Sequence, residues 1–274
     1  MRRNGNKSRK GYVIMLALFI LFIFLPFLLL PVWSFTEHWR FPNVLPIPSL
    51  RTWNYVFSAH SQVKDAVLNS LGLALATGLL SQVAAYPAAR ALGLYVKRWN
   101  KTIRFVLIAP LLIPGISIAI GVHVLFLHFG LSDRWLGVLL SHLIPAIPYS
   151  IYLLYAFYAG YDIGYEKQVR LLGASRQQTF RLVELPLLRS VLSLSFLFSF
   201  LISWSQYLFT VFIGGGNLIT LPMLLFSTLT SGDYSLIGAL CTVFVLPALV
   251  IVIFTSIEVK RDFYKGKEAN NPNV

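Results

Sequence analysis

Histidines inside apolar segments are the first candidates for chemistry in this chain: His123, His128 and His142. An imidazole changes its charge near neutral pH and can bind metals, so a histidine within a membrane could relay protons. The alternative is a hydrogen-bonded packing residue, which we favour because the spacing of the three fits no metal-ligand pattern. We therefore predict no catalytic residue and no metal site.

The ten acidic residues and the 23 lysines and arginines lie in loops, in tails or at the edges of apolar runs. Proton-coupled or sodium-coupled carriers and intramembrane proteases usually keep ionisable groups deep inside their membrane helices. The sequence therefore disfavours a carrier or membrane enzyme that works alone, although the histidines keep that alternative open. A membrane scaffold without transport activity is a third interpretation.

Nucleotide and nucleic-acid binding are both disfavoured. The one Gly-Lys pair, Gly266 with Lys267, is followed by Glu268 and lacks the upstream glycine of a phosphate-binding loop. The net charge is +13, but the basic residues flank apolar runs and do not form one patch, so we expect no nucleic-acid partner. If the protein drives uphill transport, the energy has to come from another polypeptide, and we expect no cofactor in this chain.

A polar stretch, EKQVRLLGASRQQTFRLVELP from Glu166 to Pro186, lies between two apolar runs. We expect Asp162 to cap a short helix that has Glu166 in its first turn and runs to about Leu172. Gly173 supplies the left-handed residue that ends this helix. The stretch therefore begins as a helix with a sharp glycine turn.

A second short helix is predicted directly after that turn. Ser175 and Gln178 fit a capping box, and Leu185-Pro186 leads into the next apolar run. The helix-glycine-helix pattern favours a rigid docking surface, whereas an amphipathic loop that only anchors to anionic lipid would not need the turn. The arginines available for an acidic partner or for lipid phosphates are Arg170, Arg176 and Arg181.

The rest of the chain is apolar enough to be solvated by lipid. It is 57% hydrophobic and 12% charged, and a soluble domain usually carries about 25% charge. A helix needs about 20 apolar residues to cross a membrane. We predict an all-α membrane protein, one domain over residues 1–274, with a loop at about 160–189. The six predicted spans are about 12–35, 66–90, 104–129, 136–159, 190–213 and 236–257.

Lysine and arginine counts predict the orientation. The two tails and the loops after the second and fourth predicted spans hold 19 of these residues, and the alternate loops hold four. Both termini and the 160–189 loop are therefore predicted to be cytoplasmic. We interpret the first apolar run as an uncleaved span, because it continues to Trp33 with no cleavage site after it.

The 160–189 loop resembles the cytoplasmic loop with a Glu-Ala-Ala motif in the membrane subunits of binding-protein-dependent ABC importers. The matching residues are LLGASRQQTFRLVELPLLR, Leu171 to Arg189. Glu166 lies seven residues before Gly173, one more than in the strict motif, and the two alanines are missing. Resemblance extends to LNSLGLALATGLLSQVAAYPAARAL and APLLIPGISIAIG, so it covers most of the chain.

This resemblance implies a six-span, type I importer-like fold in a bacterial cytoplasmic membrane. It also implies a second permease subunit, an extracytoplasmic binding protein and a cytoplasmic ATPase that binds ATP and Mg. The sequence does not identify which substrate is transported: polyamines, thiamine, ferric iron, phosphonates and sulfate all remain candidates. The residues that the resemblance assigns to ATPase coupling are Glu166, Arg170, Leu172, Gly173, Ala174, Ser175, Phe180, Leu185 and Pro186.

A polar stripe at helical spacing marks the fifth predicted span. Small hydroxylated residues in membrane helices more often allow close packing than contact a solute, so packing is favoured and lining of the transport pathway is the alternative. The stripe consists of Ser195, Ser199, Ser203 and Gln206.

Overall fold

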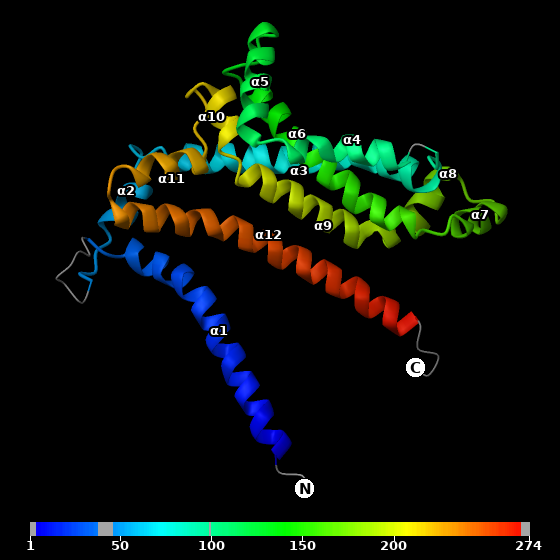
Figure 1. The fold of residues 1–274 in the computed structure, drawn as a ribbon, viewed down its shortest axis with the longest axis horizontal. Helices are drawn as coiled ribbons and strands as arrows, with labels where there is room; N and C mark the ends of the chain where they lie inside the picture. Colours follow the sequence, from blue (N-terminus) through cyan, green and yellow to red (C-terminus); the bar gives the residue numbers. More distant parts are fainter. Residues whose placement is uncertain (1–3, 38–45, 99, 270–274) are drawn as a thin grey trace. The chain divides into compact units, whose positions relative to one another are not determined.

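The computed structural model describes residues 4–37, 46–98 and 100–269, and these residues are almost entirely helical. The expected all-α membrane fold is confirmed. In chain order the helices are α1 (Asn4–Ser34), α2 (Arg51–Val56), α3 (Val63–Leu94), α4 (Asn100–Leu112), α5 (Gly115–His128), α6 (Trp135–Ala159), α7 (Gly164–Leu171), α8 (Arg176–Thr179), the π-helix η1 (Phe180–Glu184), α9 (Leu185–Trp204), α10 (Leu208–Gly214), α11 (Leu221–Leu229) and α12 (Tyr234–Ala269) (Figure 1).

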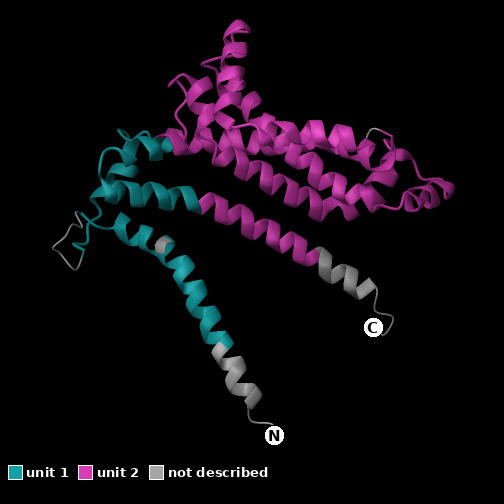
Figure 2. Cartoon of the chain, viewed as in Figure 1, with its two compact units in different colours: residues 1–64, 224–245 teal, residues 65–223, 246–274 magenta. Residues whose placement is uncertain are grey.

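The chain forms two compact units (Figure 2). The smaller unit comprises Met1–Lys64 and Leu224–Val245, and the larger comprises Asp65–Met223 and Leu246–Val274. In the smaller unit the Trp53 indole donates a hydrogen bond to the Ser34 hydroxyl over 3.2 Å, which ties α2 to the end of α1. The 160–189 loop belongs to the larger unit.

Four helices in the described part of the chain are long and apolar enough to cross a membrane by themselves: α3, α6, the continuous run Arg176–Trp204, and Tyr234–Arg261 of α12. Two further candidates are bent pairs. One is α1, which bends by 42° between Tyr12–Leu25 and Phe27–Ser34, and the other is α4 with α5. If each bent pair is one span, the total equals the six that were predicted.

The third predicted span, 104–129, differs most from expectation. It is broken at Ile113 and Pro114, and α4 and α5 meet at 94° (Figure 1). Pro114 has no N–H to continue the helical hydrogen bonds of α4, and its extended backbone (ψ 126°) starts α5 in a new direction. Each half is about 20 Å long, too short to cross a hydrocarbon core of about 30 Å.

The fifth predicted span, 190–213, begins and ends earlier than expected. Its helix α9 ends at Trp204, and α10 begins only at Leu208. The Ser205 hydroxyl donates a hydrogen bond to the Leu201 carbonyl in the last turn of α9. This break leaves Gln206 outside both helices.

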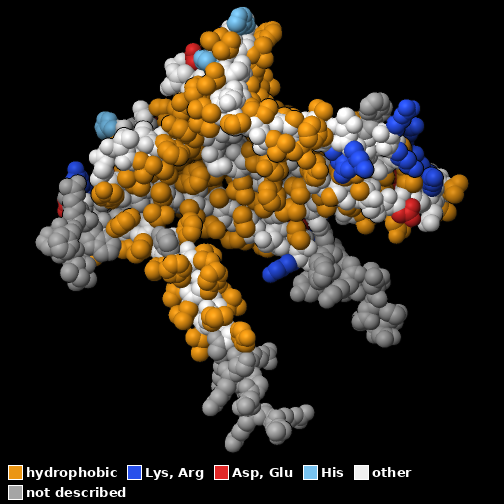
Figure 3. Space-filling view, in the orientation of Figure 1, with side chains coloured by type: hydrophobic (Ala, Val, Ile, Leu, Met, Phe, Trp, Pro, Cys, Tyr) orange, Lys and Arg blue, Asp and Glu red, His pale blue; other side chains and the backbone are white. Residues whose placement is uncertain are grey.

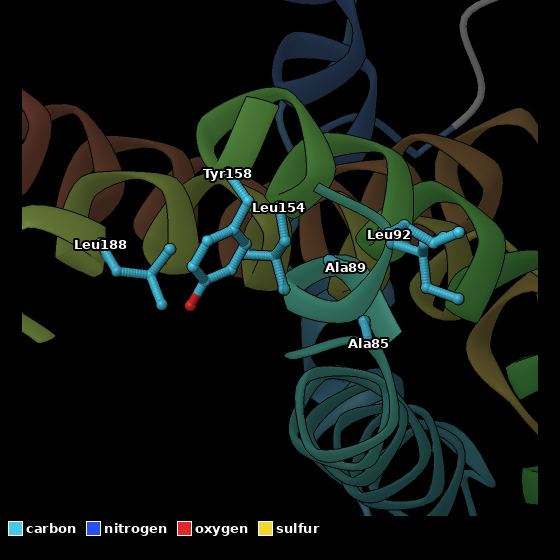
Figure 4. Packing of buried hydrophobic residues seen from close by; sticks show 7 residues of the cluster. Ala85, Ala89, Leu92, Leu154, Tyr158 and Leu188 are labelled. Carbon is cyan, nitrogen blue, oxygen red and sulfur yellow. The ribbon is translucent and has the colours of Figure 1, made fainter. Parts of the chain in front are cut away.

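Helices α3, α6 and α9 share the apolar core that supports the 160–189 loop. Figure 4 shows Leu154 and Tyr158 of α6 between Leu188 of α9 on one side and Ala89 of α3 on the other. Gly93 allows α3 to approach α6 closely, because a β-carbon there would lie 2.4 Å from the Tyr158 β-carbon. The cytoplasmic ends predicted for these three spans are therefore packed together.

Candidate functional site: the loop between α6 and α9

The first half of the 160–189 loop is a short helix with a glycine turn, as predicted. The predicted cap at Asp162 is one residue off: Ile163 is the N-cap of α7 and makes no side-chain cap hydrogen bond, while the Asp162 carboxylate accepts a hydrogen bond from the Gly164 N–H over 2.8 Å. At the other end Gly173 has φ +91°. The N–H groups of Gly173 and Ala174 donate to the Arg170 and Val169 carbonyls, which is the hydrogen-bond pattern of a Schellman motif.

The second half begins with the predicted capping box. The Ser175 hydroxyl accepts from the Gln178 N–H, and the Gln178 side chain accepts from the Ser175 N–H. The short helix α8 then continues through η1 into α9 without a break. The loop therefore turns once, at Gly173, and afterwards forms part of the fifth span.

The π-turn of η1 accommodates Pro186. In η1 the Leu185 N–H donates to the Phe180 carbonyl, five residues earlier instead of four. Proline in a regular helix removes one N–H and its ring clashes with the carbonyl four residues before it. The wider turn relieves this crowding, and it rotates Glu184 into the protein, where this side chain is buried.

The outer tip of the loop is apolar and exposed. Leu171 and Leu172 are 88% and 87% exposed, directly before the Gly173 turn. Large apolar side chains that are this exposed outside a membrane usually mark a contact surface. Figure 3 shows lysine and arginine side chains around this end of the larger unit, near α4, α7 and α8.

Glu166 does not lie on that exposed surface. Its carboxylate is buried and accepts hydrogen bonds from Nη2 of Arg90, which is 2.9 Å from each carboxylate oxygen. Arg90 lies near the end of α3, 76 residues earlier in the sequence. Arg170, one helical turn after Glu166, makes a longer contact of 3.6 Å to the same carboxylate and is half-exposed.

A second buried carboxylate, Glu184, meets the other side of the Arg90 guanidinium. Its Oε1 is in contact with Nη1 of Arg90 and accepts hydrogen bonds from the hydroxyls of Tyr86 and Tyr158. Burial, with the charges of Glu166 and Glu184, raises the pKa of the Tyr161 hydroxyl, so this group stays protonated at neutral pH. We call Arg90, Glu166, Glu184, Tyr86 and Tyr158 the Arg90 cluster.

Four members of the Arg90 cluster were not among the predicted site residues: Arg90, Glu184, Tyr86 and Tyr158. One signal was available in the sequence, because Arg90 and Glu184 are opposite charges at the edges of two apolar runs. Edge charges are also what any lipid-facing helix carries, so this signal does not by itself identify a pair.

The other predicted coupling residues are arranged around the turn. Ala174 is half-buried and Ser175 is exposed. The Phe180 ring packs edge-on against the Tyr86 ring, with centroids 5.8 Å apart. Leu185 is half-buried and Pro186 is exposed at the start of α9.

The serine stripe faces the interior of the chain. Ser195, Ser199 and Ser203 are all buried. The Ser150 hydroxyl of α6 is 2.6 Å from the Ser199 hydroxyl, and Ser199 donates to the Ser195 carbonyl. This arrangement supports the packing interpretation for the three serines.

His142 joins the stripe to α10. Its Nδ1 lies 2.8 Å from the Ser203 hydroxyl and its Nε2 lies 3.0 Å from the Thr210 hydroxyl. The Thr210 hydroxyl donates its proton to the Gln206 carbonyl, so toward His142 the Thr210 oxygen can only accept. The imidazole proton is therefore on Nε2, and Nδ1 accepts a hydrogen bond from the Ser203 hydroxyl. His142 is therefore a buried, hydrogen-bonded packing residue, which is the role that we favoured from the sequence.

Gln206, the fourth member of the stripe, lines a half-open cavity of about 240 Å³ beside the break between α4 and α5. Tyr149 and Pro145 of α6 line the same cavity, together with Gly115. No acidic or basic side chain is among its described lining residues. Lining of a transport pathway stays a prediction for Gln206.

Comparisons with known proteins agree on one family. Residues 83–260 match the model of the family "Binding-protein-dependent transport system inner membrane component". The chain is 25% identical to the spermidine/putrescine transport system permease protein PotC of Escherichia coli strain K12, over 78% of this chain and 81% of that protein. It is 29% identical to the putative 2-aminoethylphosphonate transport system permease protein PhnV of Salmonella paratyphi A, over 90% and 92%.

A solved structure shares the fold. It is a bacterial ABC transporter involved in the import of the acidic polysaccharide alginate, with a TM-score of 0.76 at 16% identity, over 93% of this chain and 98% of that chain. The family model matches more than half of the 274 residues, and this match assigns the chain to the family. The chain belongs to the binding-protein-dependent transport system inner membrane components, the multi-pass permeases of ABC importers.

Proposed function

We propose that this chain is one membrane-spanning half of an ATP-driven importer and that its 160–189 loop docks on a separate cytoplasmic ATPase. The observation that carries the proposal is the exposed Leu171–Leu172 tip on a loop whose base is fixed by the buried Arg90 cluster. A short apolar tip on a rigid base loses little conformational entropy when it enters a groove of a partner. The other predicted coupling residues surround that tip.

The partner ATPase would bind ATP and Mg and would carry out the hydrolysis. This chain has no phosphate-binding loop in its sequence, so it would contribute the docking surface and the moving spans. Cycles of ATP binding and hydrolysis would move α7, and through it the spans that form one wall of the pathway. Hydrolysis therefore would not be catalysed by the permease itself.

The charge distribution of the sequence supports this proposal. The 19 lysines and arginines on one side, against four on the other, favour a cytoplasmic location for the 160–189 loop and both termini. The membrane would be the cytoplasmic membrane of a bacterium. The segments before α2 and after α10 would then face outward, where a substrate-binding protein delivers its solute.

A second permease subunit, identical or homologous, would complete the pathway. The relatives are named for spermidine/putrescine and for 2-aminoethylphosphonate, which are small and charged in water. We therefore propose a small, charged organic solute, delivered by the binding protein. The helices described here contribute one half of its route.

Copurification with the cytoplasmic ATPase of the same importer tests the docking surface. Replacing both tip residues (Leu171→Asp with Leu172→Asp) introduces two carboxylates that a docked tip would have to desolvate. We expect recovery of the ATPase to fall at least tenfold. Tyr95→Asp is the matched control, because Tyr95 is exposed beyond the end of α3, on the same predicted side of the membrane, and lies outside the 160–189 loop.

Two results would contradict the proposal. One is equal recovery of the ATPase with the double variant and with the unaltered chain. The other is uptake of a solute, driven by an ion gradient alone, into liposomes that contain only this chain. The second result would instead establish a secondary carrier.

A further inference from the structure

The Arg90 guanidinium is the meeting point of three segments that are far apart in the sequence. It lies on α3, contacts Glu166 on α7 and contacts Glu184 in η1, directly before α9. Both carboxylates are buried. Among the described residues, the Arg90–Glu166 pair is the only ion pair that joins α7 to another helix.

The two carboxylates are not held equally. Glu184 keeps the hydroxyls of Tyr86 and Tyr158 as donors even without Arg90. Besides the pair with Arg90, the only ion-pair contact of Glu166 among the described residues is with Arg170, which is 3.6 Å away on the same helix and half-exposed. The Arg90–Glu184 contact therefore joins α3 to the start of α9, and the Arg90–Glu166 contact joins these helices to α7 in the loop.

We infer that Arg90 is a positioning residue that transmits displacement of α7 to α3 and α9, and that Glu166 acts inside the chain and not on the ATPase surface. This inference rests on the proposed function, because a docked ATPase is what would displace α7. A buried ion pair in a medium of low dielectric constant resists separation. When α7 moves, Arg90 and the helices attached to it follow.

The charge balance of the cluster offers a clean test. One guanidinium faces two carboxylates, so Glu166→Gln leaves Arg90 and Glu184 as a balanced pair and the variant is expected to fold. Gln also keeps the size of the side chain and one acceptor oxygen. The substitution therefore weakens the link to α7 and leaves the rest of the cluster in place.

The experiment uses the full complex with its ATPase. Cys241, the single cysteine of this chain, is replaced by alanine, and Ser205→Cys is labelled with a small environment-sensitive fluorophore. Ser205 is exposed at the far end of α9 from Arg90, so the label reports movement transmitted along that helix. The probe is ATP with vanadate, compared with no nucleotide. We expect the emission change to fall at least fivefold in Glu166→Gln, with unchanged recovery of the ATPase. Arg98→Gln, which removes an exposed charge after α3, is the control and keeps the full change.

Arg90→Lys is the second variant, because one ammonium cannot reach both carboxylates through separate nitrogens. It is expected to lose the emission change in the same way. A full emission change in either variant overturns the inference, and so does loss of both variants from the membrane, which would assign the cluster to folding alone. Loss of ATPase recovery in Glu166→Gln would also overturn it and would place Glu166 at the interface. If the unaltered complex shows no change, the proposed function itself fails.

Discussion

The Tyr158 hydroxyl donates a hydrogen bond to the Glu184 carboxylate, and this contact ties the last turn of α6 to the π-turn before α9. The two ends of the 160–189 loop are therefore fixed to each other at its base. Both side chains are buried, and Arg90 neutralises the carboxylate from the side of α3. The base of the loop is therefore a polar cluster in which both carboxylates and Tyr158 are buried, while Arg90 and Tyr86 are partly buried.

Stability should depend much more on Arg90 than on either carboxylate. Arg90→Gln leaves the buried Glu184 without a cation and Glu166 with only the half-exposed Arg170, and breaking a buried ion pair in this way costs about 3–5 kcal/mol. Glu166→Gln leaves a balanced pair and should cost much less. Thermal unfolding in detergent, followed by gel filtration, compares the two variants. A lower midpoint for Glu166→Gln than for Arg90→Gln would contradict this charge argument.

Gly173→Ala should loosen the loop. Gly173 has φ +91°, and a left-handed conformation costs a residue with a β-carbon about 1–2 kcal/mol. We expect faster trypsin cleavage within the loop and weaker recovery of the ATPase. Gly160→Ala is the control at the other end, because Gly160 has φ −106° and its nearest neighbour would be 3.9 Å away. Equal cleavage rates for the two variants would show that the left-handed turn is unimportant.

Gly93→Ala should separate α3 from α6. The added β-carbon would lie 2.4 Å from the Tyr158 β-carbon, and neither atom can rotate away. Overpacking of this kind costs about 1–3 kcal/mol. Gly121→Ala in α5 has no neighbour within 4 Å and should not lower the unfolding temperature of the isolated chain. A Gly93→Ala chain as stable as the unaltered one would mean that the helices can shift apart freely.

His142→Ala should destabilise the junction of α6, α9 and α10. The change removes two buried hydrogen bonds, each contributing about 0.5–1.5 kcal/mol, and leaves a cavity. His128→Ala removes an exposed imidazole from the same class of apolar segment and should have little effect. The measurement is again the unfolding midpoint in detergent. If the two variants unfold at the same temperature, the His142 bonds contribute nothing measurable.

Cysteine labelling separates packing from pathway lining in the polar stripe. In a Cys241→Ala background, Ser199→Cys should react slowly with a water-soluble thiol reagent because position 199 is buried against α6. Gln206→Cys, which lines the 240 Å³ cavity, should react at least tenfold faster. Rapid labelling of Ser199→Cys would assign the stripe to the pathway instead.

Local features of the 160–189 loop could be predicted from the sequence with good accuracy. The capping box at Ser175 and the left-handed Gly173 depend on residues within a few positions of each other, so local geometry determines them. The break at Pro114 was not part of the prediction, which treated residues 104–129 as one span. A proline shows where a helix cannot continue, but the 94° between α4 and α5 depends on what each half packs against.

The sequence by itself determined that this chain spans a membrane as helices, because its apolar runs can hide their backbone polar groups only in that way. It also determined the turn at Gly173, since few other residues adopt the left-handed conformation. Only the tertiary structure decided that Glu166 faces inward to Arg90 and that Glu184 joins them. These partners are separated by many residues, and a charge at the edge of a span looks the same in the sequence whether it meets water, lipid or another helix.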